Sequence, residues 1–153
     1  DPATFSDIRR RFLVHVTGEI PYGVETDLYQ AYLDQEDGSS IRIRKRGLRG
    51  NYVYFMTRKS PVESQQIITE RQIGPDEYVS YLNSIASLDE VLVHKLRRSF
   101  VWAKQYFEVD DFIEPRRDYQ ILEISCAPDL EIKFPPFIEV IQEITGDPLY
   151  VRL

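Results

Sequence analysis

Short segments of alternating apolar and polar residues, separated by turn-forming residues, constrain the fold of this chain more than any other feature. Alternation with a period of two is typical of β-strands. Eight strands are predicted, over residues 7–16, 26–34, 39–47, 51–59, 64–73, 91–100, 103–113 and 118–126. Turn signals at 37–39, 47–51 and 99–103 join neighbours as hairpins. The sequence therefore predicts a mainly β (α+β) protein with an antiparallel meander.

Two helices are predicted beside the strands. Pro75 and the two acidic residues after it open a helix that runs to about Ser87. Apolar residues between Phe137 and Ile144 recur every three or four positions, which predicts a second helix that ends at Gly146. We expect both helices to pack against the sheet.

Length and composition exclude several classes of protein. The 153 residues fit one domain, and a net charge of -6 argues against a nucleic-acid-binding protein. Cys126 is the only cysteine, so there is no disulfide framework or thiolate metal site, and a buried thiol in a cytoplasmic protein is expected. No apolar run approaches the roughly 20 residues that span a bilayer.

The segment Ile41 to Arg46 has the clearest chemical pattern. Alternation places Arg42, Arg44 and Arg46 on one face of a strand and the two isoleucines on the other. Guanidinium groups match the geometry of phosphate oxygens, so this face favours a phosphate ligand. A solvated outer face is the alternative when the segment is considered alone.

Other predicted strands repeat this division into a charged and an apolar face. Paired positions on their charged faces are Arg9 with Arg11, Thr57 with Lys59, Lys95 with Arg97, Glu108 with Asp110, and Glu123 with Ser125. Burying so many charges is costly unless they pair or hold a ligand. The pattern therefore predicts an eight-stranded antiparallel closed β-barrel with a polar interior and flanking helices.

The charged motifs match those of a known family in their order along the chain. The matching segments are 7–13, 41–46, 56–59, 94–97, 108–112, 122–125 and 143–150. Over nearly its whole length the chain resembles the CYTH domains, which have the triphosphate tunnel metalloenzyme fold. The resemblance implies that a polar tunnel binds inorganic triphosphate or nucleoside triphosphates, while carboxylates hold Mg²⁺ or Mn²⁺ for phosphoanhydride hydrolysis.

The resemblance also assigns site residues. It implies phosphate binding by Arg9, Arg11, Arg42, Arg44, Lys59, Lys95 and Arg97. It implies metal binding by Asp7, Glu108, Asp110 and Glu123, for which pairing with arginines is the alternative. Arg9 and Ser125, however, stand where the family has Glu. With Glu70 added to the four metal-binding candidates there are five carboxylates, fewer than the seven cations. We expect the anion to bind with no metal required, with Mg²⁺ or Mn²⁺ still compatible, and with little or no hydrolysis in this domain.

Two functions follow from the resemblance. Within the family, the chain most resembles CYTH-like domains that follow a P-loop NTPase domain in a longer protein. That reading implies a single domain, 1–153, that binds GTP or another polyphosphate and regulates membrane-protein trafficking in the cytoplasm, peripherally at endomembranes. Arg46, Arg49 and Arg58 would form a patch for a phosphoinositide surface. The alternative is a metal-dependent tripolyphosphatase or thiamine triphosphatase.

Overall fold

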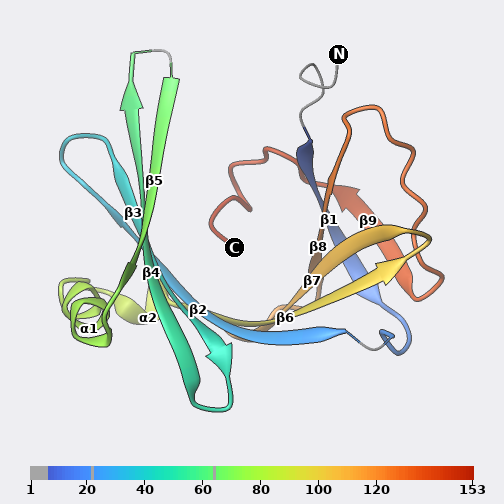
Figure 1. Cartoon of the computed structure of the whole chain (residues 1–153), viewed down its shortest axis with the longest axis horizontal. Helices are drawn as coiled ribbons and strands as arrows, with labels where there is room; N and C mark the ends of the chain where they lie inside the picture. The colour runs from blue at the N-terminus through green and yellow to red at the C-terminus, as the bar shows by residue number, and fades with distance from the viewer. Residues whose placement is uncertain (1–6, 22, 64) are drawn as a thin grey trace. The chain divides into compact units, whose positions relative to one another are not determined.

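The structure is a computed structural model that describes residues 7–21, 23–63 and 65–153 (Figure 1). The chain forms two compact units: a first unit of the residues up to 25 together with 96–153, and a second unit of 26–95. Residue 64, at which one predicted strand begins, lies outside the described residues.

The described residues form one sheet of nine strands, with two helices. The strands are β1 (Ile8–Val16), β2 (Val24–Asp34), β3 (Ser40–Leu48), β4 (Asn51–Val62), β5 (Gln65–Ile73), β6 (Val93–Trp102), β7 (Gln105–Glu114), β8 (Gln120–Cys126) and β9 (Ile138–Glu143). Their order is β5-β4-β3-β2-β6-β7-β8-β1-β9, and every pairing with a described register is antiparallel. The eight predicted strands are confirmed to within about three residues at each end.

The predicted C-terminal helix is wrong, because this segment is strand β9. It pairs with β1, from Val16 opposite Ile138 to Phe12 opposite Glu143. The β-branched residues of this segment favour a strand, and β1 supplies the backbone partners that a strand needs. Gly146 does adopt the predicted left-handed conformation, with φ of 72°, but in a turn after the strand.

The predicted first helix is confirmed at its start and is shorter than expected. Helix α1 (Pro75–Asn83) packs against β3 and β4, with Tyr78 buried, and the short α2 (Leu88–Val91) follows it. The hydroxyl of Ser84 donates a 2.7 Å hydrogen bond to the carbonyl of Tyr81. Such local bonds compete with the helical pattern, which explains the early end.

One predicted turn is displaced along the chain. The sequence suggested a turn over 99–103, whereas β6 continues to Trp102 and the turn is made by Ala103 and Lys104. Both residues have positive φ, of 49° and 61°, as two-residue hairpin turns require. The shift moves the ends of β6 and β7 without changing which side chains share a face.

Alternation separates an apolar from a polar face in both units. In the second unit, Ile41, Ile43 and Met56 belong to the apolar cluster that Tyr78 of α1 covers. In the first unit, the apolar cluster contains residues of β1, β6, β7, β8 and β9, together with the buried thiol of Cys126. The polar faces lie on the other side of the same strands. Within the described part of the chain, no helix has the length and apolar character to cross a membrane.

Candidate functional site

The polar face of the second unit carries more cations than carboxylates. Its cations are Arg42, Arg44, Arg46, Lys59 and Lys95, which we call the basic face; alternation places two carboxylates, Asp34 and Glu70, on the same side. Both carboxylates are exposed. The predicted division of β3 is confirmed, because Ile41 and Ile43 on its other side are 3% and 0% exposed.

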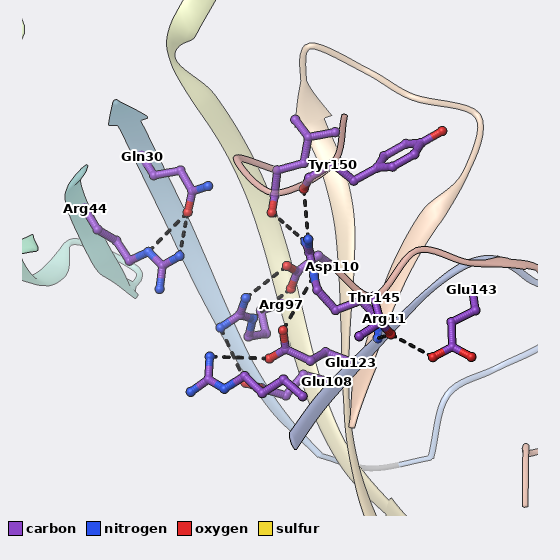
Figure 2. A network of polar contacts seen from close by, with 12 residues as sticks. Arg11, Gln30, Arg44, Arg97, Glu108, Asp110, Glu123, Glu143, Thr145 and Tyr150 are labelled. Carbon is purple, nitrogen blue, oxygen red and sulfur yellow. Dashed lines mark hydrogen bonds and ion pairs between the residues drawn. The ribbon is translucent and has the colours of Figure 1, made fainter. Parts of the chain in front are cut away.

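Arg44 is oriented by a buried amide on the neighbouring strand. Its Nε and Nη2 atoms donate hydrogen bonds of 3.2 and 2.7 Å to Oε1 of Gln30 (Figure 2). Gln30 is only 1% exposed and faces Arg44 directly in the β2–β3 register. The amide is neutral, so it holds the guanidinium in place and leaves its positive charge uncompensated by that contact. Sequence reasoning missed Gln30. A glutamine between Tyr29 and Ala31 on an alternating strand could have indicated a polar side chain on the charged face.

Arg42 lies beside a hydroxyl and a carboxylate on β4 and β5. Its Nη2 atom donates a 3.4 Å hydrogen bond to Oγ1 of Thr57, which itself donates to Glu70 at 2.8 Å. The guanidinium lies 3.6 Å from the Glu70 carboxylate, whose side chain is 53% exposed. The buried Nε of Arg42 has no hydrogen-bond partner among the described residues. A donor in that condition favours an additional acceptor such as a phosphate oxygen.

Lys95 belongs to the same side of the sheet. Its neighbour His94 points to the apolar side, where it stacks on Tyr29 at 4.0 Å and lies 3.1 Å from Asp27. Alternation therefore turns Lys95 toward the side of Gln30, where it is 1% exposed.

On the polar face of the first unit, three arginines and three carboxylates contact one another, and we call this set the paired face. Its members are Arg9, Arg11, Arg97, Glu108, Asp110 and Glu123. Arg97 donates hydrogen bonds of 2.7 and 3.0 Å to the two oxygens of Asp110 and lies 3.5 Å from Glu108 (Figure 2). Burial lowers the pKa of Arg97, but the bonds to Asp110 and the nearby carboxylates raise it above its usual value overall. This arginine is a permanent counter-ion for two carboxylates.

Arg11 and Arg9 share the third carboxylate of the paired face. Glu123 lies 3.6 Å from Arg11 and 3.8 Å from Arg9. Arg11 also donates to the main-chain oxygens of Tyr150 and Leu153, at 2.9 and 2.8 Å. Sequence reasoning did not foresee these contacts, since acceptors on the main chain leave no mark in the side-chain pattern. Arg11 is thus surrounded by acceptors.

The predicted metal-binding residues do not gather around one point. Glu108 and Asp110 are bound to Arg97, Glu123 lies by Arg11, and Asp7 is exposed just before β1. Among the described residues, no group of three or more acidic, histidine or cysteine side chains is arranged to hold a metal ion. As arranged here, these carboxylates fit the alternative of pairing with arginines better than a divalent ion.

The three arginines of the predicted lipid patch are not brought together. Arg46 and Arg49 lie at the β3–β4 turn, where Arg46 stands over Phe55 at 5.2 Å. Arg58 lies at the other end of β4, beside Ser39 and Asp37 of the β2–β3 turn. Arg46 is paired with Val53 of β4, and Arg58 lies five positions further along that strand, which corresponds to about 17 Å.

Two solved structures are similar to this chain over nearly its whole length. One is described as the hypothetical protein NE1496 and the other as the inorganic triphosphatase NE1496. Each is 26% identical with a TM-score of 0.69 and covers 96% of this chain; the matches cover 95% and 91% of those chains. No protein-family model matches the sequence, and no curated protein matches it either.

Proposed function

Because this chain has the fold of the CYTH triphosphate tunnel proteins, we propose that it binds inorganic triphosphate or a related polyphosphate through the basic face. The observation that carries the proposal is the excess of cations on this face, five against two exposed carboxylates. Phosphate oxygens accept charge-assisted hydrogen bonds from arginine and lysine side chains. Closure of the sheet into a tunnel is part of the proposal.

Four of the five cations of the basic face have a role in this proposal. Arg44, held by Gln30, and Arg42, with its orphan Nε, bind phosphate oxygens as forked donors. Lys59 and Lys95 act as point charges beside them. Side chains on one strand face lie roughly 7 Å apart, so Arg42 and Arg44 can contact different phosphate groups of one triphosphate. Phosphate binding by Arg9, Arg11 and Arg97 stays a prediction, since each has acceptors already.

Hydrolysis is a second candidate function, favoured by the similarity to a solved inorganic triphosphatase. Of the carboxylates that would hold Mg²⁺ or Mn²⁺, Glu108, Asp110 and Glu123 lie within ion-pair distance of arginines. GTP, thiamine triphosphate and phosphoinositide headgroups carry the same phosphate chemistry. All three are therefore tested as ligands beside inorganic triphosphate. Only phosphoinositide binding would support a role in membrane-protein trafficking.

Calorimetric titration of the protein with inorganic triphosphate, in EDTA and in Mg²⁺, tests the binding. We expect binding in both buffers, and loss of at least about tenfold in affinity for Arg44→Gln, which removes one charge-assisted contact. Arg116→Gln, in an exposed turn, is the matched control. Absence of binding in both buffers would overturn the proposal.

Phosphate release from the same ligands with Mg²⁺ or Mn²⁺ separates the two candidates. Release near one per second would be ordinary enzymatic turnover and would make the chain a triphosphatase. Binding without release supports a binding domain. Vesicles with and without phosphoinositide identify a lipid ligand, which Arg46→Gln should weaken if the headgroup uses the basic face.

A further inference from the structure

The apolar side of the first unit ends in a row of polar residues that the proposed function does not use. Alternation places Arg98, Asp111 and Gln120 on the side opposite Arg97 and Asp110, in line with the buried residues Val109 and Leu122. The row lies on the adjacent strands β6, β7 and β8. It therefore borders the core directly.

A cavity of about 220 Å³ lies at this row. Its lining consists of Val16, Ile20, Arg98, Val109, Asp111 and Gln120. A second cavity of about 210 Å³ shares Ile20 and Arg98 with the first and adds Pro21, Gly23 and Glu25. A side chain at Gly23 would bring its Cβ to 1.9 Å from the carbonyl oxygen of Ser99, so glycine is required where this wall meets β6.

The charges that line the cavity are not paired with one another. Neither a hydrogen bond nor an ion pair of Arg98 is found among the described residues, although its side chain is half-buried. Within the described part of the chain, the Asp111 side chain accepts only a long 3.4 Å hydrogen bond from Gln120, whose own Oε1 accepts from the backbone of Val16. On the other side of β6 and β7, by contrast, Arg97 and Asp110 form an ion pair at 2.7 Å.

Arg98 and Asp111 carry opposite charges and line one cavity without forming an ion pair. A ligand with both a negative and a positive group could therefore bind between them. The first cavity has about seven times the volume of a water molecule in the liquid. It is smaller than the 300–1,000 Å³ of pockets for drug-sized ligands. Its remaining wall, from Val16, Ile20 and Val109, is aliphatic. The chemistry that fits is a small zwitterion with a branched aliphatic side chain.

We propose that this cavity binds an aliphatic α-amino acid such as leucine or valine. The ligand carboxylate forms a forked pair with Arg98, and the ammonium group donates to Asp111. The side chain packs on Val16, Ile20 and Val109. This site is separate from the basic face, so it does not depend on polyphosphate binding.

Ligand analogues test the proposal on the unmodified protein. Leucine, 4-methylpentanoate, which lacks the ammonium group, and 3-methylbutylamine, which lacks the carboxylate, are titrated by calorimetry and by amide NMR. We expect leucine to bind at least about tenfold more tightly than either analogue. Equal affinities, no binding at millimolar leucine, or NMR shifts confined to the basic face would each overturn the proposal.

Two variants then assign the charges. Arg98→Gln should weaken leucine at least about tenfold and leave 3-methylbutylamine unchanged, whereas Asp111→Asn should weaken leucine and leave 4-methylpentanoate unchanged. Arg116→Gln removes the same charge from an exposed turn and should change nothing. Triphosphate affinity should be unaffected in all three. Unchanged leucine binding in folded Arg98→Gln contradicts the proposal. If that variant does not fold, the relative affinities of leucine and its two analogues for the unmodified protein decide the question.

Discussion

The polar faces of the two units follow the same strand alternation but differ in charge balance. On the paired face of the first unit, three arginines meet three carboxylates at 2.7 to 3.8 Å. On the basic face of the second unit, five cations share a surface with two exposed carboxylates, and Arg44 is held by a neutral amide. The first arrangement pairs its opposite charges, while the second has more cations than carboxylates, which is the basis of the proposed anion binding.

This difference changes what each arginine contributes to the protein. An arginine between buried carboxylates is required for the fold, because its loss leaves uncompensated charge. An arginine paired only with an exposed carboxylate costs little to remove, and on the basic face we propose that such an arginine contributes to the affinity for a ligand. The five predictions below test this contrast, starting with the largest effect.

The largest effect is expected on the stability of the paired face. Arg97→Met removes the guanidinium group that contacts Glu108 and Asp110, the latter with a side chain that is only 6% exposed. Breaking a buried ion pair in this way costs about 3–5 kcal/mol of the free energy of unfolding, measurable by urea denaturation. Arg116→Met is the control. A loss below about 1 kcal/mol would remove the distinction between the two faces.

Arg42→Met makes the corresponding change on the basic face. Its only described ion pair is with a half-exposed carboxylate, so the free energy of unfolding should change by less than about 1 kcal/mol. Affinity for inorganic triphosphate should fall by about tenfold to a hundredfold, since a charge-assisted hydrogen bond is worth about 1.5–3 kcal/mol. Calorimetry measures the second effect. Unchanged affinity would show that the anion binds elsewhere.

A double variant can shift the paired face toward a metal site. Arg9 and Ser125 stand directly opposite each other in the β1–β8 register, next to Glu123. Arg9→Glu with Ser125→Glu therefore gathers three carboxylates, which should tighten Mn²⁺ binding at least about tenfold. Titration of Mn²⁺ measures it, and Arg9→Gln with Ser125→Gln is the control. Equal Mn²⁺ affinity in the two variants would be the contrary result.

Removing a carboxylate from the basic face should increase its excess of positive charge and strengthen triphosphate binding. Glu70→Gln keeps an acceptor for Thr57 and removes a negative charge that lies 3.6 Å from Arg42. Because the site is partly exposed, triphosphate affinity should rise only by about threefold. Glu77→Gln, which removes the same charge near Arg71 and off this face, provides the comparison. Weaker binding in Glu70→Gln would mean that Glu70 positions Arg42 for the ligand.

The smallest effect concerns an exposed pair in the first unit. Hydrogen bonds from Arg10 and Thr145 lower the pKa of Glu143. A lowered pKa in the folded state contributes stability above the unfolded value of about 4.3, and this stability is lost as the pH falls through the folded value. Glu143→Gln should therefore flatten the dependence of stability on pH below about pH 5. An unchanged acid profile would assign no such role to this pair.

Much of the fold follows from local patterns, and its exceptions have identifiable causes. The strands and the apolar face of Ile41 and Ile43 were predicted correctly, because alternation is a property of each strand alone. Strand β9 was predicted as a helix because Ile138 to Ile144 satisfies both periods. The backbone of β1 resolves that ambiguity, and its availability cannot be read from residues 138–144.

The sequence by itself determined which side chains share a face, since a period of two needs no information from distant residues. It also showed the cations on the charged strand faces, whereas the replacement of two Glu by Arg9 and Ser125 is implied only by the resemblance to CYTH domains. Only the tertiary structure decided which charges meet: Arg97 with Asp110, Arg11 with Glu123, and Arg44 with the amide of Gln30. Electrostatic pairing depends on distances of a few ångströms between strands, and the order and register of the sheet set these distances.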